Sequence, residues 1–308
     1  MKADPVATKE WLERTVTRLA AEAPENRLPG FSGLMVFDPP LVGFADGDGP
    51  LFHAFSEAVD VRHIQPRAFL RSCFPRKPEA ERLSVIAWAL PFSPGVRESN
   101  REGEWPSPLY SLARNRGQAV LQGTSRRLVS LLRSRGVAAA APALSTAYDI
   151  FHSSEFTYSS TWSERHVAYA AGLGRFGLNG SLITARGSHV RLGSVVAGLA
   201  LDLPPVGLEG FRAPCFESRG TLCRRCIDRC PVGAVTTEGL DKRTCNARRK
   251  AVRERSLSAL RKKHPLKRFR LPIDGARRWS YPLGCALCQC GVPCEGREPF
   301  PATPKQHA

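Results

Sequence analysis

The chain has 308 residues, and its 45 lysine and arginine residues against 28 aspartate and glutamate residues give a formal net charge of +17. A chain of this length can bury a substantial core, as one large domain or two smaller ones. No apolar run approaches the roughly 18 residues of a membrane span, and the charged N-terminus lacks the apolar core of a secretory signal. We therefore expect a cytoplasmic protein without a membrane span, in which disulfides are disfavoured.

Helical and strand patterns alternate over the first two thirds of the chain. Apolar spacing predicts helices over residues 9–23 and 110–135, the second with a break at Gly123, and short apolar runs predict strands over 31–37, 84–90, 137–144 and 195–203. Thr161 and Glu164 match a capping box, which predicts a helix that begins at Thr161 and ends near Gly172. The mixture predicts an α/β (α+β) fold.

The composition changes after Pro204-Pro205, where the sequence becomes rich in cysteine and basic residues. This change predicts a domain boundary near residue 206. We expect an α/β domain over residues 1–206 and a second domain over residues 207–308.

Nine of the ten cysteines lie between Cys215 and Cys294, and Cys73 stands alone, as expected of a structural thiol. In a reducing compartment such clustering indicates metal or iron–sulfur ligation. The run Cys223-x2-Cys226-x3-Cys230-Pro231 is typical of [4Fe–4S] proteins, in which the cysteine before proline binds the other of two cubes. The run usually has one more cysteine, at the position of Gly220 here, and Cys215 is the nearest replacement.

Five further cysteines follow downstream, at positions Cys245, Cys285, Cys288, Cys290 and Cys294. Eight ligands for two [4Fe–4S] clusters are therefore available, with two cysteines to spare. The alternative is zinc, because four-cysteine zinc ribbons also use C-x2-C pairs.

Three stretches resemble the dicluster half of epoxyqueuosine reductases, which are relatives of the corrinoid reductive dehalogenases. They are CRRCIDRCPVGAV (223–235), YPLGCALCQC (281–290) and SERHVAYAAGLGRFGLNG (163–180). The resemblance implies an oxidoreductase whose ferredoxin-like C-terminal domain passes electrons through two [4Fe–4S] clusters to an N-terminal pocket, with cobalamin as the implied cofactor. The alternative function is a ferredoxin-like electron carrier without a corrinoid or a substrate.

The resemblance also implies how the cysteines divide. One cluster would be held by Cys230, Cys245, Cys285 and Cys288, and the other by Cys215, Cys223, Cys226 and Cys294. The last ligand could also be Cys290, although we prefer Cys294, which leaves Cys290 as a free thiol near a cluster.

Further site residues are carried over from the same family. Epoxyqueuosine reductases have a proton-donating aspartate six residues before the E-R pair, which here is Glu164-Arg165, and this position is Tyr158. Tyr158 is thus the candidate proton donor, or else only a half-buried residue. The corrinoid pocket would be bordered by Gly172, Gly174, Gly177 and Asn179, unless these glycines serve a tight turn. His166 is expected to be an ordinary core or surface histidine.

The basic block from Lys242 to Arg270 contains one acid, Glu254. The block could bind an acidic electron donor such as a flavodoxin or ferredoxin, or it could bind nucleic acid. Alternatively, it is a solvated face of a helix. Leu178 replaces a family lysine, and the C-terminal helical repeats with which the family engages tRNA do not follow Cys294. These differences argue against a tRNA substrate and leave a small molecule as the expected one.

Overall fold

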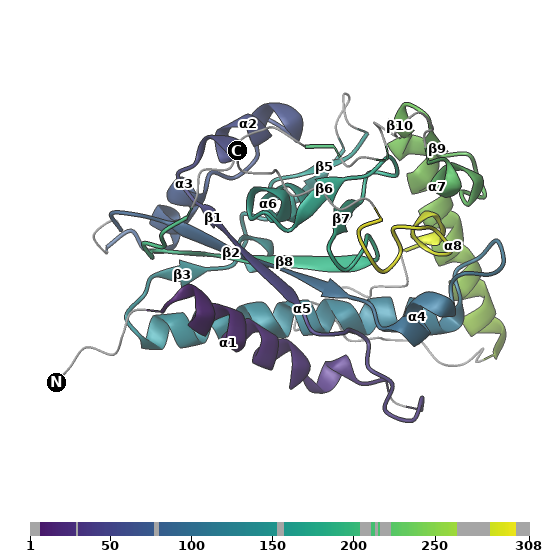
Figure 1. Ribbon diagram of the computed structural model, residues 1–308, viewed down its shortest axis with the longest axis horizontal. Coiled ribbons are helices and arrows are strands. Elements are labelled where there is room, and N and C mark those ends of the chain that lie inside the picture. Colours follow the sequence, from purple (N-terminus) through teal and green to yellow (C-terminus); the bar gives the residue numbers. More distant parts are fainter. Residues whose placement is uncertain are drawn as a thin grey trace, which may run out of the picture.

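A four-stranded antiparallel sheet forms the centre of the computed structural model, with helices on both faces (Figure 1). The structure describes residues 7–28, 30–76, 80–152, 157–203, 211–212, 215, 223–263 and 284–299. The strand order is β1 (Leu41–Asp46), β2 (Ser84–Pro91), β8 (Val190–Ala197) and β3 (Ala139–Ala140). The combination of helix and strand confirms the predicted α/β (α+β) class.

Strand β2 lies at the middle of the sheet and is buried along its whole length. Both faces of the sheet are covered, so a continuous apolar run is stable there and a polar/apolar alternation is not needed. Trp88 pairs with Gly193 of β8, and a Cβ atom at Gly193 would lie 2.8 Å from the Trp88 ring. Glycine therefore allows the largest side chain of β2 to lie across its neighbour.

Two hydrophobic cores flank the sheet. Helices α1 (Lys9–Ala21) and α5 (Pro108–Ser134) pack on one face around Trp88. Helices α2 (Pro50–Ala58), α3 (Pro66–Cys73) and α6 (Glu164–Ala170) pack on the other around Trp162. The short helix α4 (Pro94–Glu98) follows β2.

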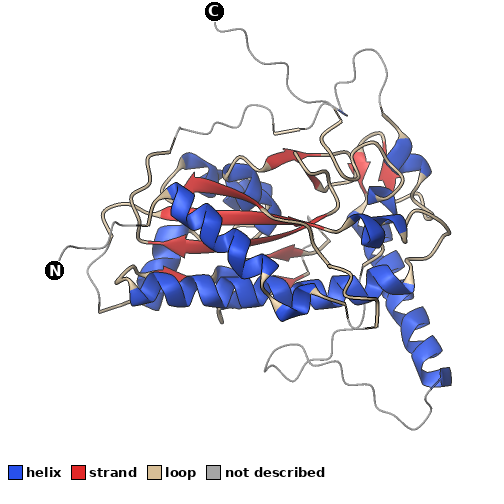
Figure 2. Cartoon of the chain, turned by 60° about the horizontal axis from the view of Figure 1, so that its bottom comes forward, coloured by secondary structure: helices blue, strands red, loops and turns tan. Residues whose placement is uncertain are grey.

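The elements of the cysteine-rich region gather at one end of the sheet (Figure 1). They are α7 (Arg225–Asp228), the hairpin β9 (Val235–Thr236) and β10 (Gly239–Leu240), α8 (Lys242–Lys263) and the 3-10 turn η4 (Leu287–Gln289). Helix α8 extends away from the body of the protein (Figure 2). The predicted domain boundary at residue 206 lies outside the described residues, and the division into domains stays a prediction.

Several smaller elements complete the described part of the chain. They are the hairpins β4 (Ile150–Phe151) with β5 (Ser159–Ser160) and β6 (Gly174–Phe176) with β7 (Leu182–Thr184), and the 3-10 turns η1 (Pro24–Asn26) and η2 (Pro142–Leu144). Within the described residues, no helix combines the length and the apolar character needed to cross a bilayer.

The prediction of a strand over residues 31–37 is wrong. Gly30, Ser32 and Gly33 have positive φ values, so this segment turns instead of extending, and the edge strand is β1. The strand predicted over 137–144 is limited to Ala139–Ala140, because Pro142 cannot donate to a ladder and begins η2. The strand predicted over 195–203 begins earlier and ends at Ala197.

The predicted helices over 9–23 and 110–135 are confirmed as α1 and α5, and α5 continues through Gly123 without a break. The predicted capping box is wrong, because α6 begins at Glu164 after the N-cap Ser163. The Thr161 hydroxyl donates to the Ala147 carbonyl oxygen, and Glu164 accepts from Ser194. The end of the helix near Gly172, whose φ is +72°, agrees with the prediction.

Candidate metal centre

Eight of the ten cysteines form two neighbouring groups of four thiols, which we call the first and second tetrads. The first tetrad is Cys215, Cys223, Cys226 and Cys294, and the second is Cys230, Cys245, Cys285 and Cys288. None of the ten cysteines is in a disulfide. Leu178, Ile183, Val235 and Val292 pack with six of the thiols in one apolar cluster.

In the first tetrad every thiol lies within electrostatic reach of the other three. Burial, followed by the neighbouring thiols of Cys294, Cys215 and Cys223, raises the pKa of Cys226 to about 12. Burial and then Cys215 and Cys223 likewise raise the pKa of Cys294. Four thiols that oppose one another's ionisation need a cationic centre to become thiolates, which is the state that binds metal.

The second tetrad has the same character. Burial raises the pKa of Cys288 well above its ordinary value, and Cys245, Cys285 and Cys230 add to the effect. Cys226 of the first tetrad also acts on Cys288, so the two groups adjoin. The backbone amide of Ala234 donates a hydrogen bond to the Cys230 sulfur at 3.2 Å. Hydrogen bonds of this kind to ligand sulfur atoms are a feature of iron–sulfur sites.

Side chains from the sheet half of the protein hold the C-terminal cysteine segment in place. Asn100 Nδ2 donates to the Cys285 carbonyl oxygen at 3.2 Å, and Asn179 Nδ2 donates to that of Cys288 at 3.0 Å. The amide of Ser188 donates to the Cys294 carbonyl oxygen at 2.7 Å. Three of the four described C-terminal cysteines are thus positioned through their backbone.

Charged groups strengthen this contact. Arg101 pairs with Glu295 at 2.8 Å, and Arg175 pairs with Glu298 at 2.8 Å. The Arg229 guanidinium, which precedes Cys230, donates to the Asn100 and Arg101 carbonyl oxygens at 3.2 and 2.7 Å. The cysteine-rich segment is therefore fixed against the loop that follows α4.

Cys290 faces a different environment from the tetrads. Its buried sulfur lies 3.5 Å from both Asn100 Nδ2 and His189 Nδ1. One ligand atom each from His189, Cys290 and Glu295 lies within 4.8 Å of the others, a spacing that could hold a metal ion. The Glu295 carboxylate is already neutralised by Arg101, which disfavours a cation here.

Tyr158, the candidate proton donor, lies beside the second tetrad. Arg249 Nη1 donates to its hydroxyl oxygen at 2.9 Å, and Tyr158 is half-buried. Arg249 also acts electrostatically on Cys245, as Arg165 does. The hydrogen-bonded pair of Tyr158 and Arg249 therefore lies within electrostatic reach of a thiol of the second tetrad.

The residues predicted to border a corrinoid have contacts within the protein. Gly174 lies in β6 directly against the Ile183 carbonyl oxygen, where no Cβ atom would fit. Asn179 is buried and binds Cys288 and Ser181. Gly177 lies against the Ile183 side chain, and only Gly172 has open space at its Cα among these three glycines.

His166 packs among Phe55, Phe176 and Phe211, and its Nδ1 lies 2.7 Å from Ser163 Oγ. Burial lowers its pKa to about 3, so it is neutral. This confirms the prediction of an ordinary, satisfied histidine.

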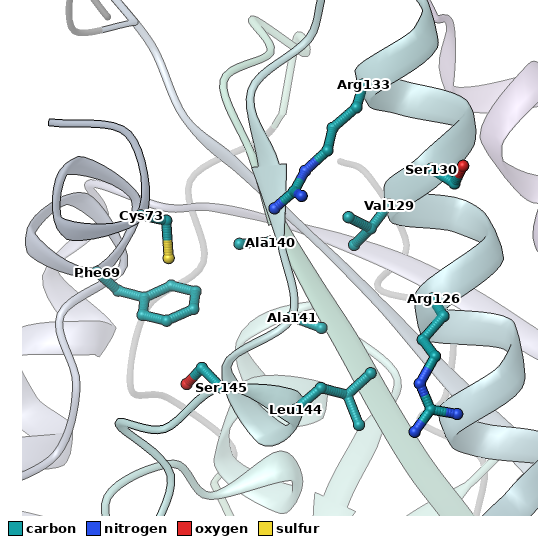
Figure 3. Close-up of a pocket in the computed structure, with 10 residues that line it drawn as sticks. All are labelled: Phe69, Cys73, Arg126, Val129, Ser130, Arg133, Ala140, Ala141, Leu144 and Ser145. Carbon is teal, nitrogen blue, oxygen red and sulfur yellow. The ribbon is translucent and has the colours of Figure 1, made fainter. Parts of the chain in front are cut away.

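A separate pocket of about 520 Å³ lies between the end of α3 and the second half of α5 (Figure 3). Its walls include Cys73 and Phe69 on one side and Arg126 and Arg133 on the other. The pocket is at the end of the sheet away from α7 and α8 (Figure 1), so it is not part of the metal centre. Cys73 is exposed at its rim.

Comparisons with known proteins returned only structural likenesses. No family model matches the chain, and no curated protein sequence matches it. A selenomethionine-labelled epoxyqueuosine reductase aligns at 15% identity over 96% of this chain and 68% of its own, with a TM-score of 0.43. The N-terminally tagged catabolic reductive dehalogenase NpRdhA aligns at 15% identity over 77% of this chain, with a TM-score of 0.41.

The chain spans only 33% of that dehalogenase. The same dehalogenase in complex with 3-bromo-4-hydroxybenzoic acid aligns at 16% identity, with a TM-score of 0.38. The two proteins are reductases of the two groups that the sequence resembles.

Sequence reasoning missed Asn100, Arg101, Ser188 and Glu295, which position the cysteine segment. Asn100 and Cys285 are 185 residues apart, and no local pattern marks such a pair. The segment AGLGRFGLNG predicts Asn179 as a cofactor contact. In the structure its side chain instead donates to the Cys288 carbonyl oxygen.

Glu164 provides a test of the buried layer beside the site. Burial raises its pKa to about 7, against hydrogen bonds from Ser194 and Trp162. Between the ordinary glutamate pKa of 4.5 and pH 7, the folded state keeps a proton that the unfolded state loses, so stability falls as the pH rises. A Glu164→Gln variant should match the wild type near pH 4.5 and exceed it at pH 8, by on the order of 2 kcal/mol.

Anaerobic urea unfolding at both pH values measures this difference. Glu98→Gln, at an exposed position on α4, is the control and should show none. A Glu164→Gln effect that is the same at both pH values would show that the carboxylate is ionised in the folded state.

Proposed function

We propose that the protein is an oxidoreductase that binds one [4Fe–4S] cluster at each tetrad and delivers electrons to an acceptor beside Tyr158. The observation that carries the proposal is the pair of adjoining tetrads of buried thiols. Each tetrad offers the four thiolates that a [4Fe–4S] cube requires, and bound clusters would supply single-electron transfer. Zinc would use the same donors, but it has no redox chemistry for two neighbouring sites to share.

The arrangement of residues gives the two tetrads different roles. Cys226 and Cys288 adjoin where the tetrads meet, and Cys245 of the second tetrad lies near Arg249 and Tyr158. The second tetrad is therefore on the acceptor side, and the first tetrad, which includes Cys226 of α7, is on the donor side.

Cobalamin is the acceptor that the family resemblance implies, and it would supply the bond-breaking chemistry. Two of the four residues predicted to border it, Gly174 and Asn179, are engaged within the protein. Gly172 is the one of the three glycines with open space at its Cα, so a corrinoid at that segment would have to approach there. We propose that the acceptor is bound in the region of Tyr158.

The division of cysteines can be tested at Cys290 and Cys294, which are four residues apart. Cys294→Ala should lose about half of the bound iron and acid-labile sulfide, because it removes a ligand of the first tetrad. Cys290→Ala should keep the full amount, since its thiol contacts Asn100 and His189. Iron and sulfide analysis of anaerobically purified variants measures both, and the reverse result would assign Cys290 as the ligand.

Tyr158 is proposed as the proton donor to the reduced acceptor. Arg249 donates a hydrogen bond to the Tyr158 hydroxyl oxygen. The hydroxyl hydrogen of Tyr158 can therefore be donated to another acceptor. A Tyr158→Phe variant should keep its iron and sulfide but lose turnover by about a hundredfold, the usual scale for a lost acid catalyst. Turnover equal to that of the wild type would reject this role.

We propose that an acidic electron donor docks at α7, where Arg224 and Arg225 are exposed beside the first tetrad. Reversing both charges, as Arg224→Glu with Arg225→Glu, should slow reduction by flavodoxin about tenfold at low salt and flatten its salt dependence. The matched control reverses Arg14 and Arg18, two exposed residues of α1 on the far layer. Stopped-flow measurement of the reduction rate compares the two double variants. Equal slowing in both would mean that the rate depends only on net charge and would reject docking at α7.

The basic block of the sequence is largely helix α8, with its residues after 263 outside the described part of the chain. Arg243, Lys250 and Arg253 are exposed there. If charge reversal on α8 slowed reduction and reversal on α7 did not, the donor would dock on α8 instead.

A further inference from the structure

Four arginines from four different elements converge beside the second tetrad. Arg114 comes from α5, Arg165 from α6, Arg191 from β8 and Arg249 from α8, and all four are half-buried. Arg191 acts electrostatically on Arg114 and Arg249, and Arg165 acts on Arg249. We call these four residues the arginine cluster.

The local structure explains why these side chains meet. Tyr110, Arg114 and Gln118 follow one another at intervals of four residues, so they share one face of α5. Gln118 accepts a hydrogen bond from Arg191, which places that face over the start of β8. Gly284 packs directly against the Arg114 side chain, which closes the cluster on the side of the cysteine segment.

Within the described part of the chain, three members of the cluster have no carboxylate to balance their charge. No ion pair there joins Arg114, Arg165 or Arg191 to an acidic side chain, and the groups that oppose their charge are tyrosines and, for Arg165, also the Cys245 thiol. The Nε atom of Arg191 is shielded from solvent and has no hydrogen-bond partner within the described chain. Burial, followed by Arg114, lowers the pKa of Arg191 to about 9, as expected for a charge that lacks a counterion.

Iron–sulfur clusters would balance only part of this charge. Cys245 acts on Arg165 and Arg249, so a negatively charged cluster on the second tetrad would reach these two arginines. The main electrostatic partners of Arg114 and Arg191 are tyrosines and other arginines instead. Among the residues that the structure describes, no anionic group pairs with either of these two guanidinium groups.

We propose that Arg114 and Arg191 bind the phosphate or carboxylate group of a small-molecule ligand, with Arg165, Arg249 and Tyr158 on its inner side. Guanidinium groups donate two parallel hydrogen bonds to such oxyanions, and a half-buried arginine pair without a paired carboxylate suits this geometry. The inference deepens the proposed function, because this ligand would be the electron acceptor, but anion binding itself does not require the clusters.

The test uses the intact, anaerobically purified protein and two probes, inorganic phosphate and acetate, with chloride added to keep the ionic strength constant. One of the two should raise the thermal unfolding midpoint in a saturable manner. The probe that does so distinguishes a phosphate from a carboxylate site. If neither raises the midpoint above that in chloride, the proposal is wrong.

Arginine variants then locate the site. Arg114→Gln and Arg191→Gln should weaken the apparent affinity for the effective probe at least tenfold, which corresponds to about 1.4 kcal/mol. Arg127→Gln removes the same charge from an exposed position on α5 and should leave the affinity unchanged. An equal loss in Arg127→Gln would contradict a local site.

Stability without the probe separates a binding role from a structural one. Arg191→Gln removes a repelled charge, so it should unfold at the same temperature as the wild type or higher in chloride alone. A lower unfolding temperature with unchanged probe affinity would make Arg191 a structural residue and overturn the proposal. If Arg191→Gln does not fold, Arg191→Lys keeps the charge and removes the two-pronged donor geometry, and it should still weaken binding.

Iron analysis of the same samples keeps the two proposals apart. Saturable anion binding in a protein without iron would reject the clusters and leave the anion site standing. Full iron content without any anion effect would reject the anion site alone.

Discussion

The structure depends on the mutual repulsion that the buried cysteines would experience as thiolates. Six of the eight tetrad thiols pack in one apolar cluster, and burial together with the neighbouring thiols raises the pKa of members such as Cys226 and Cys288. Thiols whose pKa is raised in this way stay protonated near neutral pH, and they become thiolate ligands only when a cation offsets their burial and mutual repulsion. A metal centre at each tetrad reverses the sign of that interaction and accounts for the clustering.

The tetrads also determine how the chain is closed. Each takes members from both ends of the cysteine region, since Cys294 joins Cys223 and Cys226, while Cys285 and Cys288 join Cys230. Side chains of the sheet half then bind the backbone of the last segment, as Asn100 and Asn179 do. The arginine cluster lies where these parts meet, so the proposed metal centre and the proposed ligand site share one boundary.

The sequence allowed prediction of what local patterns encode. The apolar periodicity of α1 and α5 and the continuous apolar run of β2 identify these elements, and the spacing of Cys223, Cys226 and Cys230 indicates metal binding. The apolar residues between Gly30 and Phe37 predict a strand, but their pattern carries no signal of the left-handed backbone at Gly30, Ser32 and Gly33. The arginine cluster was not predicted, since Arg114, Arg191 and Arg249 are brought together only by packing across the sheet.

The most direct measurement is the iron, acid-labile sulfide and zinc content of protein purified without oxygen. Two [4Fe–4S] clusters predict about eight iron and eight sulfide per chain, with broad absorption near 400 nm. A colourless protein that contains zinc and no sulfide would contradict the redox account, although the tetrads themselves would remain metal sites.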